Sequence, residues 1–428
     1  MAEQSSNATL FQNVRIFDGK NDLISAPSDV LVEGSRIARI SATTPVSDLD
    51  RHVTFVAGGG RVLMPGLIDA HWHAMFATLP FVALTTADVG YANLAAGQEA
   101  EATLLRGFTA VRDVGGPVFG LKRAIDEGIV VGPRIYPSGA FISQTSGHGD
   151  FRMPYEVPRA VGDPLSYLER VGISAIADSP DEVRLRAREQ LRQGASQLKL
   201  MAGGGVASHF DPIDATQYTE AEIRAAVEAA ENWGTYVTVH AYTPHSIRNA
   251  VAAGVKCVEH GQLIDEPTAE LLAQHEVWLS LQPFLDDEDA IPLPDPEQRR
   301  KAGEVFAGTD TAYTLANRYG IRVAFGTDTL FDPRLAARQG AQLAKLVRWY
   351  PTAGVLKMAT SDNAELLALS GPRNPYPGKL GVVEEGALAD LLLVDGDPMQ
   401  NIRLLEDPAT NLLVIMKDGQ IYKNLLAA

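Results

Sequence analysis

The chain has 428 residues, of which 46% are hydrophobic and 21% are charged, and its formal net charge is −16. This length and composition are typical of a globular protein with a large core, and they exclude a fibrous or disordered chain. The negative charge argues against nucleic acid and anionic membranes as partners, because both would repel such a surface.

Residues 1–65 are predicted to form short β-strands separated by turns. The turn signals are Asp18-Gly19 and Glu33-Gly34. The predicted strands cover residues 10–16, 29–33, 36–40 and 53–56. The stretch before them has neither a basic start nor an apolar segment, so we expect a cytoplasmic protein without a membrane span; a removed leader peptide stays an open alternative.

The middle of the chain alternates apolar runs with segments of helical periodicity. The runs cover residues 62–68, 108–113, 134–143, 197–202, 235–241, 257–260, 278–283 and 323–327. Eight such units favour a closed parallel (β/α)8 TIM barrel. One of the helices between the runs is predicted to begin at the capping box Thr219-Glu-Ala-Glu222 and to end at Gly234.

The C-terminal part returns to short β-strands. They are predicted at residues 390–395, 411–416 and 420–423, with Asp418-Gly419 as a hairpin turn. The sequence therefore predicts an α/β protein with a TIM barrel over residues 66–375. A small β-sandwich domain is expected from both chain ends, residues 1–65 and 376–428.

Six side chains suited to metal chemistry lie in or at the end of these apolar runs. They are His71, His73, Lys199, His240, His260 and Asp328. The carboxyl ends of barrel strands meet at one face, so we expect the six to share a site. Imidazoles and carboxylates are zinc ligands, and a buried lysine is costly unless its charge is removed or neutralised. One tetrahedral site uses four ligands, so six candidates favour a hydrolytic site with two metals. The alternative for Lys199 is a lysine that forms a salt bridge inside the barrel.

The same segments carry a family resemblance. They are His71-Trp-His73 after Pro65-Gly-Leu-Ile-Asp69, then Lys199, His240, His260, Asp328 and the closing Glu385-Gly-Ala-Leu-Ala-Asp-Leu391. Together they resemble the metal-dependent amidohydrolase superfamily over essentially the whole chain. The segments 147–150, 198–204, 240–243 and 259–261 are similar to its prolidase-like subgroup of Xaa-Pro dipeptidases and carboxypeptidases, which also includes enzymes that hydrolyse ochratoxin.

The resemblance implies a binuclear zinc centre. In the family pattern Lys199 is carbamylated by carbon dioxide and bridges two Zn²⁺ or similar divalent ions. His71, His73 and Asp328 would hold one ion, and His240 and His260 the other. Asp328 would also accept a proton from the attacking water and deliver it to the leaving amine.

Other residues have expected roles near this centre. By resemblance, His148 polarises the scissile carbonyl, and Tyr242 donates its phenol proton to the same oxygen or to a substrate carboxylate. A role in shaping the pocket only is the alternative for both. His209 is a candidate substrate contact, and Arg112 with Asp113 are either a structural pair or a substrate contact.

The resemblance implies an amide hydrolase that acts as a carboxypeptidase or dipeptidase on dipeptides or N-acyl amino acids. Ochratoxin A, cleaved to phenylalanine and ochratoxin alpha, is a candidate substrate. A lactonase or phosphotriesterase on the same metals and a non-catalytic barrel that only binds a partner are the alternatives. The expected partner is a small-molecule substrate, and the expected assembly is a homo-oligomer such as an octamer.

Overall fold

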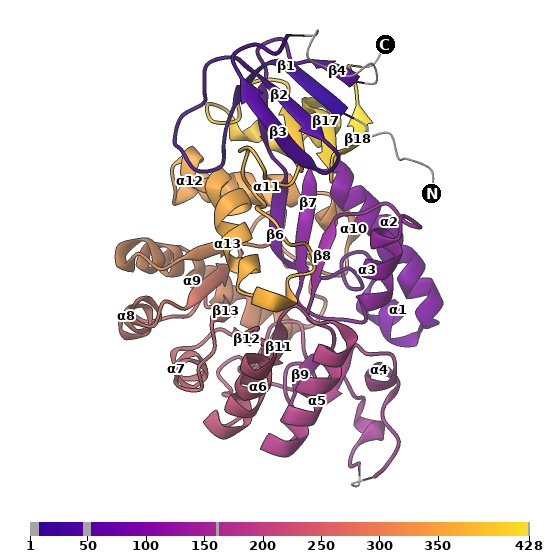
Figure 1. Cartoon of the computed structure of the whole chain (residues 1–428). Coiled ribbons are helices and arrows are strands. Elements are labelled where there is room, and N and C mark those ends of the chain that lie inside the picture. The colour runs from indigo at the N-terminus through magenta and orange to yellow at the C-terminus, as the bar shows by residue number, and fades with distance from the viewer. Residues whose placement is uncertain (1–7, 46–52, 160–161, 427–428) are drawn as a thin grey trace.

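The computed structural model describes residues 8–45, 53–159 and 162–426. Figure 1 shows a β-rich part at the top, where both ends of the chain lie, and a larger body below in which helices surround central strands. Residues 1–7, which bear on the expectation about a leader peptide, lie outside the described residues.

The β-rich part is one sheet built from both ends of the chain. Its strands are β1 (Ala8–Ile16), β2 (Ser28–Glu33), β3 (Arg36–Ser41), β4 (Val53–Ala57), β5 (Val62–Pro65), β16 (Leu391–Val394), β17 (Leu412–Lys417) and β18 (Gln420–Asn424). They follow the order β18-β17-β16-β5-β1-β2-β3, with β4 paired to β1. Because β16 pairs antiparallel with β5, the C-terminal strands continue the N-terminal sheet. The terminal strand predictions are confirmed to within two residues.

The central strands are parallel and form two ladders. The first ladder contains β6 (Leu67–Trp72), β7 (Phe108–Asp113) and β8 (Arg134–Pro137). The second contains β9 (Phe141–Ser143), β10 (Ser174–Ile176), β11 (Leu198–Met201), β12 (Val237–Ala241), β13 (Cys257–His260), β14 (Trp278–Leu281) and β15 (Val323–Phe325). The alternation of strand and helix is therefore that of an α/β protein, as predicted.

Two of the eight predicted runs are each divided between sheets. The run at 62–68 is split at Gly66, because β5 belongs to the terminal sheet and β6 to the central strands. Gly66 lies so close to Thr109 that a Cβ would come within 2.0 Å of its Oγ1. The run at 134–143 is split between β8 and β9, where Gly139 has a φ of 81°. Strand β10 was not predicted.

The edges of the two central ladders meet where β15 ends. The backbone N–H of Asp328 donates to the carbonyl oxygen of His71 at 2.8 Å. Gly326 makes this approach possible, since a Cβ there would lie 2.4 Å from the Cβ of His71. The candidate residues of β6 and of the chain after β15 are therefore neighbours, although 257 positions separate His71 from Asp328 in the sequence.

Helices connect the central strands and also follow the last of them. They are α1 (Phe81–Thr86), α2 (Val89–Leu105), α3 (Phe119–Asp126), α4 (Tyr167–Arg170), α5 (Pro180–Gln193), α6 (Glu220–Trp233), α7 (Pro244–Ala252), α8 (Glu266–Gln274), α9 (Pro296–Tyr319), α10 (Pro333–Ala336), α11 (Gln339–Lys345), α12 (Thr352–Lys357), α13 (Asn363–Ala368) and α14 (Pro408–Asn411). The predicted capping box of α6 is confirmed: Thr219 caps the helix, and Gly234 ends it with a φ of 72°.

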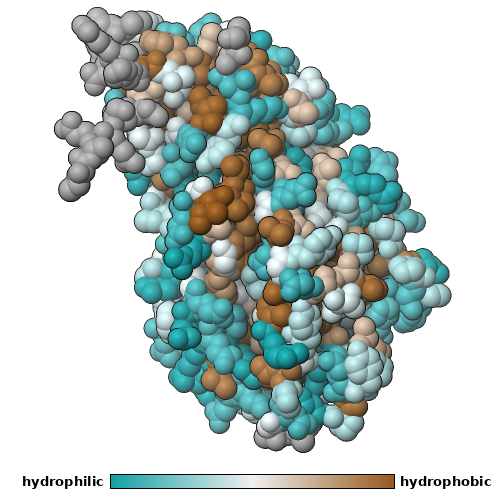
Figure 2. Space-filling model, turned by 90° about the vertical axis from the view of Figure 1, so that its right-hand side faces the viewer, coloured by the Kyte–Doolittle hydropathy of each residue, from teal (hydrophilic) through white to brown (hydrophobic). Residues whose placement is uncertain are grey.

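The surface mixes polar and apolar residues. On the face shown in Figure 2, hydrophilic residues predominate and hydrophobic residues are interspersed among them. Scattered apolar residues of this kind are normal on folded proteins and need no special explanation. No helix in the described ranges combines the length and the apolar composition that crossing a bilayer requires.

Candidate metal centre

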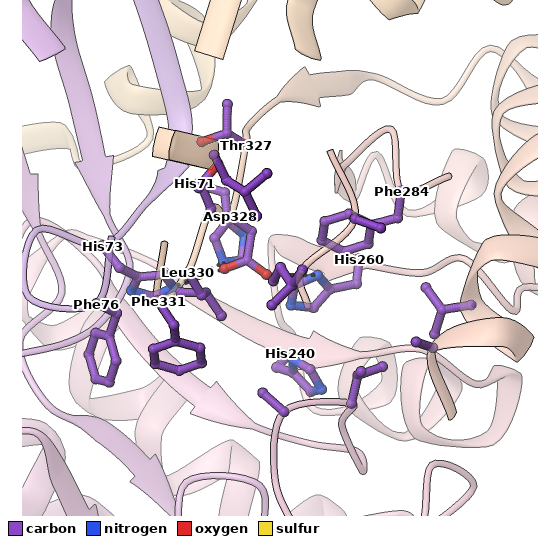
Figure 3. Close-up of a pocket in the computed structure, with 18 of the residues that line it drawn as sticks. His71, His73, Phe76, His240, His260, Phe284, Thr327, Asp328, Leu330 and Phe331 are labelled. Carbon is purple, nitrogen blue, oxygen red and sulfur yellow. Dashed lines mark hydrogen bonds and ion pairs between the residues drawn. The ribbon is translucent and has the colours of Figure 1, made fainter. Parts of the chain in front are cut away.

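The six predicted metal-binding residues line one pocket at the carboxyl ends of the central strands. His71 lies on β6 with His73 just after it, Lys199 on β11, His240 on β12, His260 at the end of β13 and Asp328 shortly after β15. Figure 3 shows Asp328 between His73 on one side and His260 on the other, with His240 below them. The tertiary structure therefore brings together all six residues.

Three of these side chains converge on Asp328. Its Oδ1 lies 3.3 Å from Nε2 of His71 and 3.4 Å from Nε2 of His73. Its Oδ2 lies 3.9 Å from Nδ1 of His260. Ligand atoms of His71, His260 and Asp328 lie within 4.8 Å of one another, which is close enough to hold one metal ion.

Hydrogen bonds on the outer side fix the tautomers of His71 and His73. Nδ1 of His73 faces the carbonyl oxygen of Gly115 at 3.1 Å, and Nδ1 of His71 faces a carboxylate oxygen of Glu259 at 2.8 Å. Both partners only accept, so each Nδ1 carries the proton and each Nε2 of the neutral ring presents a lone pair. The two Nε2 atoms are nevertheless 3.3 Å apart and both face a carboxylate. Such a group of acceptors fits a cation at its centre.

The other two histidines are fixed in the same way. Nδ1 of His260 lies 2.8 Å from Oε1 of Gln282, whose Nε2 donates to the carbonyl oxygen of Ser280 and so sets the orientation of the amide. Nε2 of His240 lies 3.0 Å from the carbonyl oxygen of Gly204. One nitrogen of each ring is therefore engaged outside the pocket, and the other remains as a ligand.

Burial favours the neutral form of three of these imidazoles. It also acts to lower the pKa of His71, but Asp328 and Glu259 raise that pKa overall. Removal from water holds the pKa values of His240 and His260 well below the usual range and also lowers the pKa of His73. Burial alone would raise the pKa of Asp328, but the charge of His71 and its hydrogen bond hold that pKa well below its usual range. His73, His240 and His260 are therefore neutral nitrogen donors beside an ionised carboxylate, which are the forms that bind divalent metals.

Lys199 is buried among the same residues, with 2% of its surface exposed. Burial lowers the pKa of its amine to about 8, although Glu259 and Asp328 act in the opposite direction. In the part of the chain that the structure describes, no carboxylate lies within salt-bridge distance of its Nζ. This geometry does not support the alternative of a lysine held in an internal salt bridge.

Two of the candidate ligands occupy an unusual backbone conformation. The φ angles of His260 and Asp328 are 78° and 47°. A residue other than glycine in this left-handed region costs about 1–3 kcal/mol, and such residues concentrate at functional sites. The surrounding strands hold both residues there, and both side chains point into the pocket.

His148 and Tyr242 line the same pocket. His148 lies on the loop after β9, and its ring stacks on His240 with centroids 4.2 Å apart. Tyr242 follows β12, and its ring lies 5.0 Å from both His240 and His260. Burial raises the pKa of the Tyr242 phenol well above its usual value, so the hydroxyl keeps its proton and can donate it.

Comparison with known proteins places the chain in a family. Residues 62–423 match the amidohydrolase family. The chain belongs to this family. Amidohydrolases are generally metal-dependent, which agrees with the cluster formed by His71, His260 and Asp328.

Several relatives resemble this amidohydrolase over most of its length. It is 32% identical to the ochratoxinase of Aspergillus niger over 381 residues, which cover 85% of this chain and 76% of that protein. A solved prolidase in complex with N-methylphosphonate-L-proline superposes with a TM-score of 0.88 at 33% identity, covering 98% and 100% of the two chains. A Xaa-Pro dipeptidase with bound methionine superposes with a TM-score of 0.82 at 28% identity, covering 98% and 100%. The chain is thus a prolidase-like amidohydrolase, a hydrolase of carbon–nitrogen bonds.

The walls of the pocket of this amidohydrolase are largely apolar. Figure 3 places Phe76 and Phe331 on the side of His73 and Phe284 on the side of His260. Further aromatic residues lining the pocket are Phe81, Phe141, Phe151 and Phe306. Apolar surface on both sides of the polar centre was not predicted, because its residues come from loops that lie far apart in the sequence.

The alternative left open for Arg112 and Asp113 is decided in favour of structural roles. Arg112 is fully buried and donates to Glu259 at 2.7 Å; burial alone would lower its pKa, but that carboxylate raises it overall. Asp113 accepts from the backbone N–H groups of Ala74 and Gly115. His209, the candidate substrate contact, is exposed and does not line the pocket among the described residues.

Glu259 is a functional residue that the sequence did not predict. One of its oxygens accepts from His71 and the other from Arg112 and from the hydroxyl of Thr238. Burial alone would raise the pKa of Glu259, but Arg112 holds it well below the usual range. The available signal was its position directly before His260 on a buried strand, where an unpaired carboxylate would be costly.

Replacing Glu259 with glutamine is expected to weaken metal binding by about 10- to 100-fold. The amide has only one acceptor oxygen, so either His71 Nδ1 or Arg112 must face an NH2 group. Competition with a chelating dye measures the affinity. Glu270→Gln, an exposed substitution on α8, is the matched control and should bind metal normally. Equal affinity of the Glu259→Gln variant and wild type would contradict the role of Glu259.

Proposed function

We propose that this amidohydrolase is a binuclear zinc enzyme that acts as a carboxypeptidase or dipeptidase on dipeptides or N-acyl amino acids. The observation that carries the proposal is the convergence of four histidines, one lysine and one aspartate on a single pocket. The corresponding architecture is a closed (β/α)8 barrel over residues 66–375, with the shared sheet of residues 1–65 and 376–428 folded over on itself as a β-sandwich domain. A homo-oligomer such as an octamer and a cytoplasmic location belong to the same proposal.

The six residues are divided between two metal ions in this proposal. His71, His73 and Asp328 would hold one ion, and His240 and His260 would hold the other. Lys199, as a carbamate, would be a ligand of both. Divalent ions bound there would lower the pKa of water, so that a nucleophile exists at neutral pH.

The environment of Lys199 supports its carbamylation. Only the neutral amine is nucleophilic, and burial lowers the pKa of this amine to about 8. The nitrogen forms a bond with the carbon of carbon dioxide and loses a proton, which leaves a carbamate with one negative charge. The resulting anion supplies the carboxylate oxygens that a lysine lacks.

The side chains of the pocket then have distinct tasks. Asp328 accepts a proton from the attacking water and delivers it to the nitrogen of the leaving amine. His148 and Tyr242 donate hydrogen bonds to the carbonyl oxygen of the scissile amide and to the carboxylate of the substrate. Among the described residues that line the pocket there is no arginine, and Lys199 is the only lysine. We assign recognition of a substrate carboxylate to His148 and Tyr242.

The apolar walls favour a substrate with an apolar group on each side of the amide bond. Phe76 and Phe331 lie on one side of the polar centre and Phe284 on the other. An aromatic N-acyl amino acid has this shape. Ochratoxin A, cleaved to phenylalanine and ochratoxin alpha, is the substrate of this class that we propose, and the similarity to an ochratoxinase supports the choice.

A screen of paired substrates tests the proposal. Dipeptides and N-acyl amino acids are each offered with a free and with an esterified C-terminal carboxylate. We expect free acids to react at least about tenfold faster, because masking the carboxylate leaves buried donors of the enzyme unpaired. The carboxypeptidase assignment is falsified if both forms are cleaved equally well. Preferential turnover of lactones or phosphotriesters would instead support a different bond specificity at the same site.

A further inference from the structure

The ring of His148 is held from outside the pocket by a loop that the mechanism above does not use. This loop, residues 203–217, follows β11 and is called here the β11 loop. Nδ1 of His148 lies 2.7 Å from the hydroxyl oxygen of Ser208 and 3.3 Å from Oδ2 of Asp211. Both partners are buried. They contact the nitrogen that faces away from the pocket.

Asp211 has few other partners. Its Oδ2 accepts from the backbone N–H of Gly205 at 2.8 Å and lies 3.5 Å from the amide of Gln217. Its Oδ1 is buried and has no hydrogen-bond partner. His148 is the only group that forms an ion pair with this carboxylate within the described ranges of the chain. A buried carboxylate is costly, so its placement beside a single imidazole calls for a reason.

A buried lysine of α9 fixes the backbone of the β11 loop. Nζ of Lys301 donates to the carbonyl oxygens of Gly205 and Ser208, both at 2.7 Å, and of Asp211 at 3.1 Å. An ammonium has three N–H donors, and these three carbonyls use all of them. Because Lys301 is only 1% exposed, the three contacts are shielded from water. The loop therefore presents Ser208 and Asp211 in a fixed position.

The His148 ring is confined on both faces. His240 stacks on one face with an interplanar angle of 22°. Gly205 covers the ring so closely that a Cβ would lie 2.0 Å from Cε1 of His148. The backbone N–H of His148 also donates to the side chain of Gln217 at 2.9 Å. With Nδ1 engaged by the loop, Nε2 is the nitrogen that remains for a ligand in the pocket.

We infer that Asp211, together with Ser208, is a positioning residue that orients the His148 ring so that Nε2 faces the substrate oxygen. The inference rests on the proposed function, since it assigns His148 a contact with substrate. It extends that function to a loop anchored by Lys301. Asp211 touches neither substrate nor metal in this assignment and acts only through His148.

The test is a double-mutant cycle in the metal-loaded enzyme. Asp211→Asn keeps the shape of the side chain and the acceptor for Gly205, but it removes the charge that holds His148. We expect kcat to fall about 10- to 100-fold with KM little changed. In a His148→Ala background the same substitution should have no further effect, because a residue that acts only through His148 has nothing left to orient. Asp214→Asn, an exposed change on the same loop, is the matched control and should leave kcat unchanged.

A second readout does not depend on activity. In protein labelled with ¹⁵N-histidine, the signals lost in His148→Ala identify this ring. We expect Asp211→Asn to move these signals while elemental analysis shows unchanged metal content. Ser208→Ala, which removes the 2.7 Å contact, serves as the second variant if Asp211→Asn does not fold.

Each outcome decides the inference. If the His148 signals do not move in Asp211→Asn, Asp211 does not position the ring, even where His148→Ala is inactive. The proposed function then stands without this inference. An equal loss of kcat from Asp211→Asn in the wild-type and His148→Ala backgrounds also overturns it, because the effect would not pass through His148. Full activity of His148→Ala overturns the contact of His148 with substrate and the positioning role with it.

Discussion

Replacing Lys199 with alanine is expected to abolish amide hydrolysis while leaving a folded protein. Lys199 is buried between the two sets of proposed ligands, and its loss removes the bridging carbamate without opening a large apolar cavity. Turnover should fall by at least about 10³-fold, because a lost bridge removes a ligand from both ions. Elemental analysis of the wild type should give two ions per chain, and the variant should retain fewer.

Two additions make the Lys199 experiment specific. Short-chain carboxylic acids, supplied with bicarbonate, should partly restore turnover in Lys199→Ala by replacing the missing bridge. Lys417→Ala is the control, since Lys417 is a buried lysine of the terminal sheet that donates to the carbonyl oxygen of Gly132. This control should bind two ions. Wild-type turnover in Lys199→Ala would rule out the bridge, and one ion per chain in the wild type with unmodified Lys199 would indicate a mononuclear centre.

Replacing Asp328 with asparagine is expected to lower kcat by about 10²- to 10⁴-fold, the usual contribution of a positioned acid or base. The amide preserves the shape and one acceptor oxygen near His71 and His73. It cannot accept the proton of the attacking water or carry it to the leaving amine. Steady-state kinetics with a free N-acyl amino acid measure the effect.

Metal content separates the two tasks of Asp328. A variant that keeps both ions and loses kcat has lost proton transfer, whereas a variant that loses an ion has lost a ligand. Asp332→Asn is the matched control four residues further along the chain. Asp332 caps α10 and does not line the pocket, and asparagine is an equally good N-cap. Undiminished kcat in Asp328→Asn would contradict proton transfer by this residue.

The sequence by itself determined the residues at the strand ends. His71, His240 and His260 are recognisable because each lies in or directly follows a short apolar run. The carboxyl end of such a run can be located from the local sequence alone, and that is where barrel enzymes carry their functional residues. The helix over residues 220–233 could be predicted equally well, since its capping box and its terminal glycine are local signals. Local patterns of this kind depend on neighbouring residues only.

The tertiary structure alone decided where strands divide. The runs at 62–68 and 134–143 were each predicted as one strand, yet each belongs to two sheets. Their division depends on Gly66, which lies against Thr109, and on the positive φ of Gly139. Hydrophobicity marks which residues are buried but carries no information about the sheet in which they are buried.

The hydrogen-bond partners on the outer side of the candidate ligands could not be predicted from the sequence either. Glu259 contacts His71 across 188 positions, and Ser208 contacts His148 across 60. Neither contact has a local motif, because a carboxylate or a hydroxyl acquires its partner only when distant strands and loops meet. The sequence therefore identified the candidate metal ligands. The packing of the central strands decided which nitrogen of each ring is free to do so, since a buried donor must be satisfied by whatever acceptor the fold brings beside it.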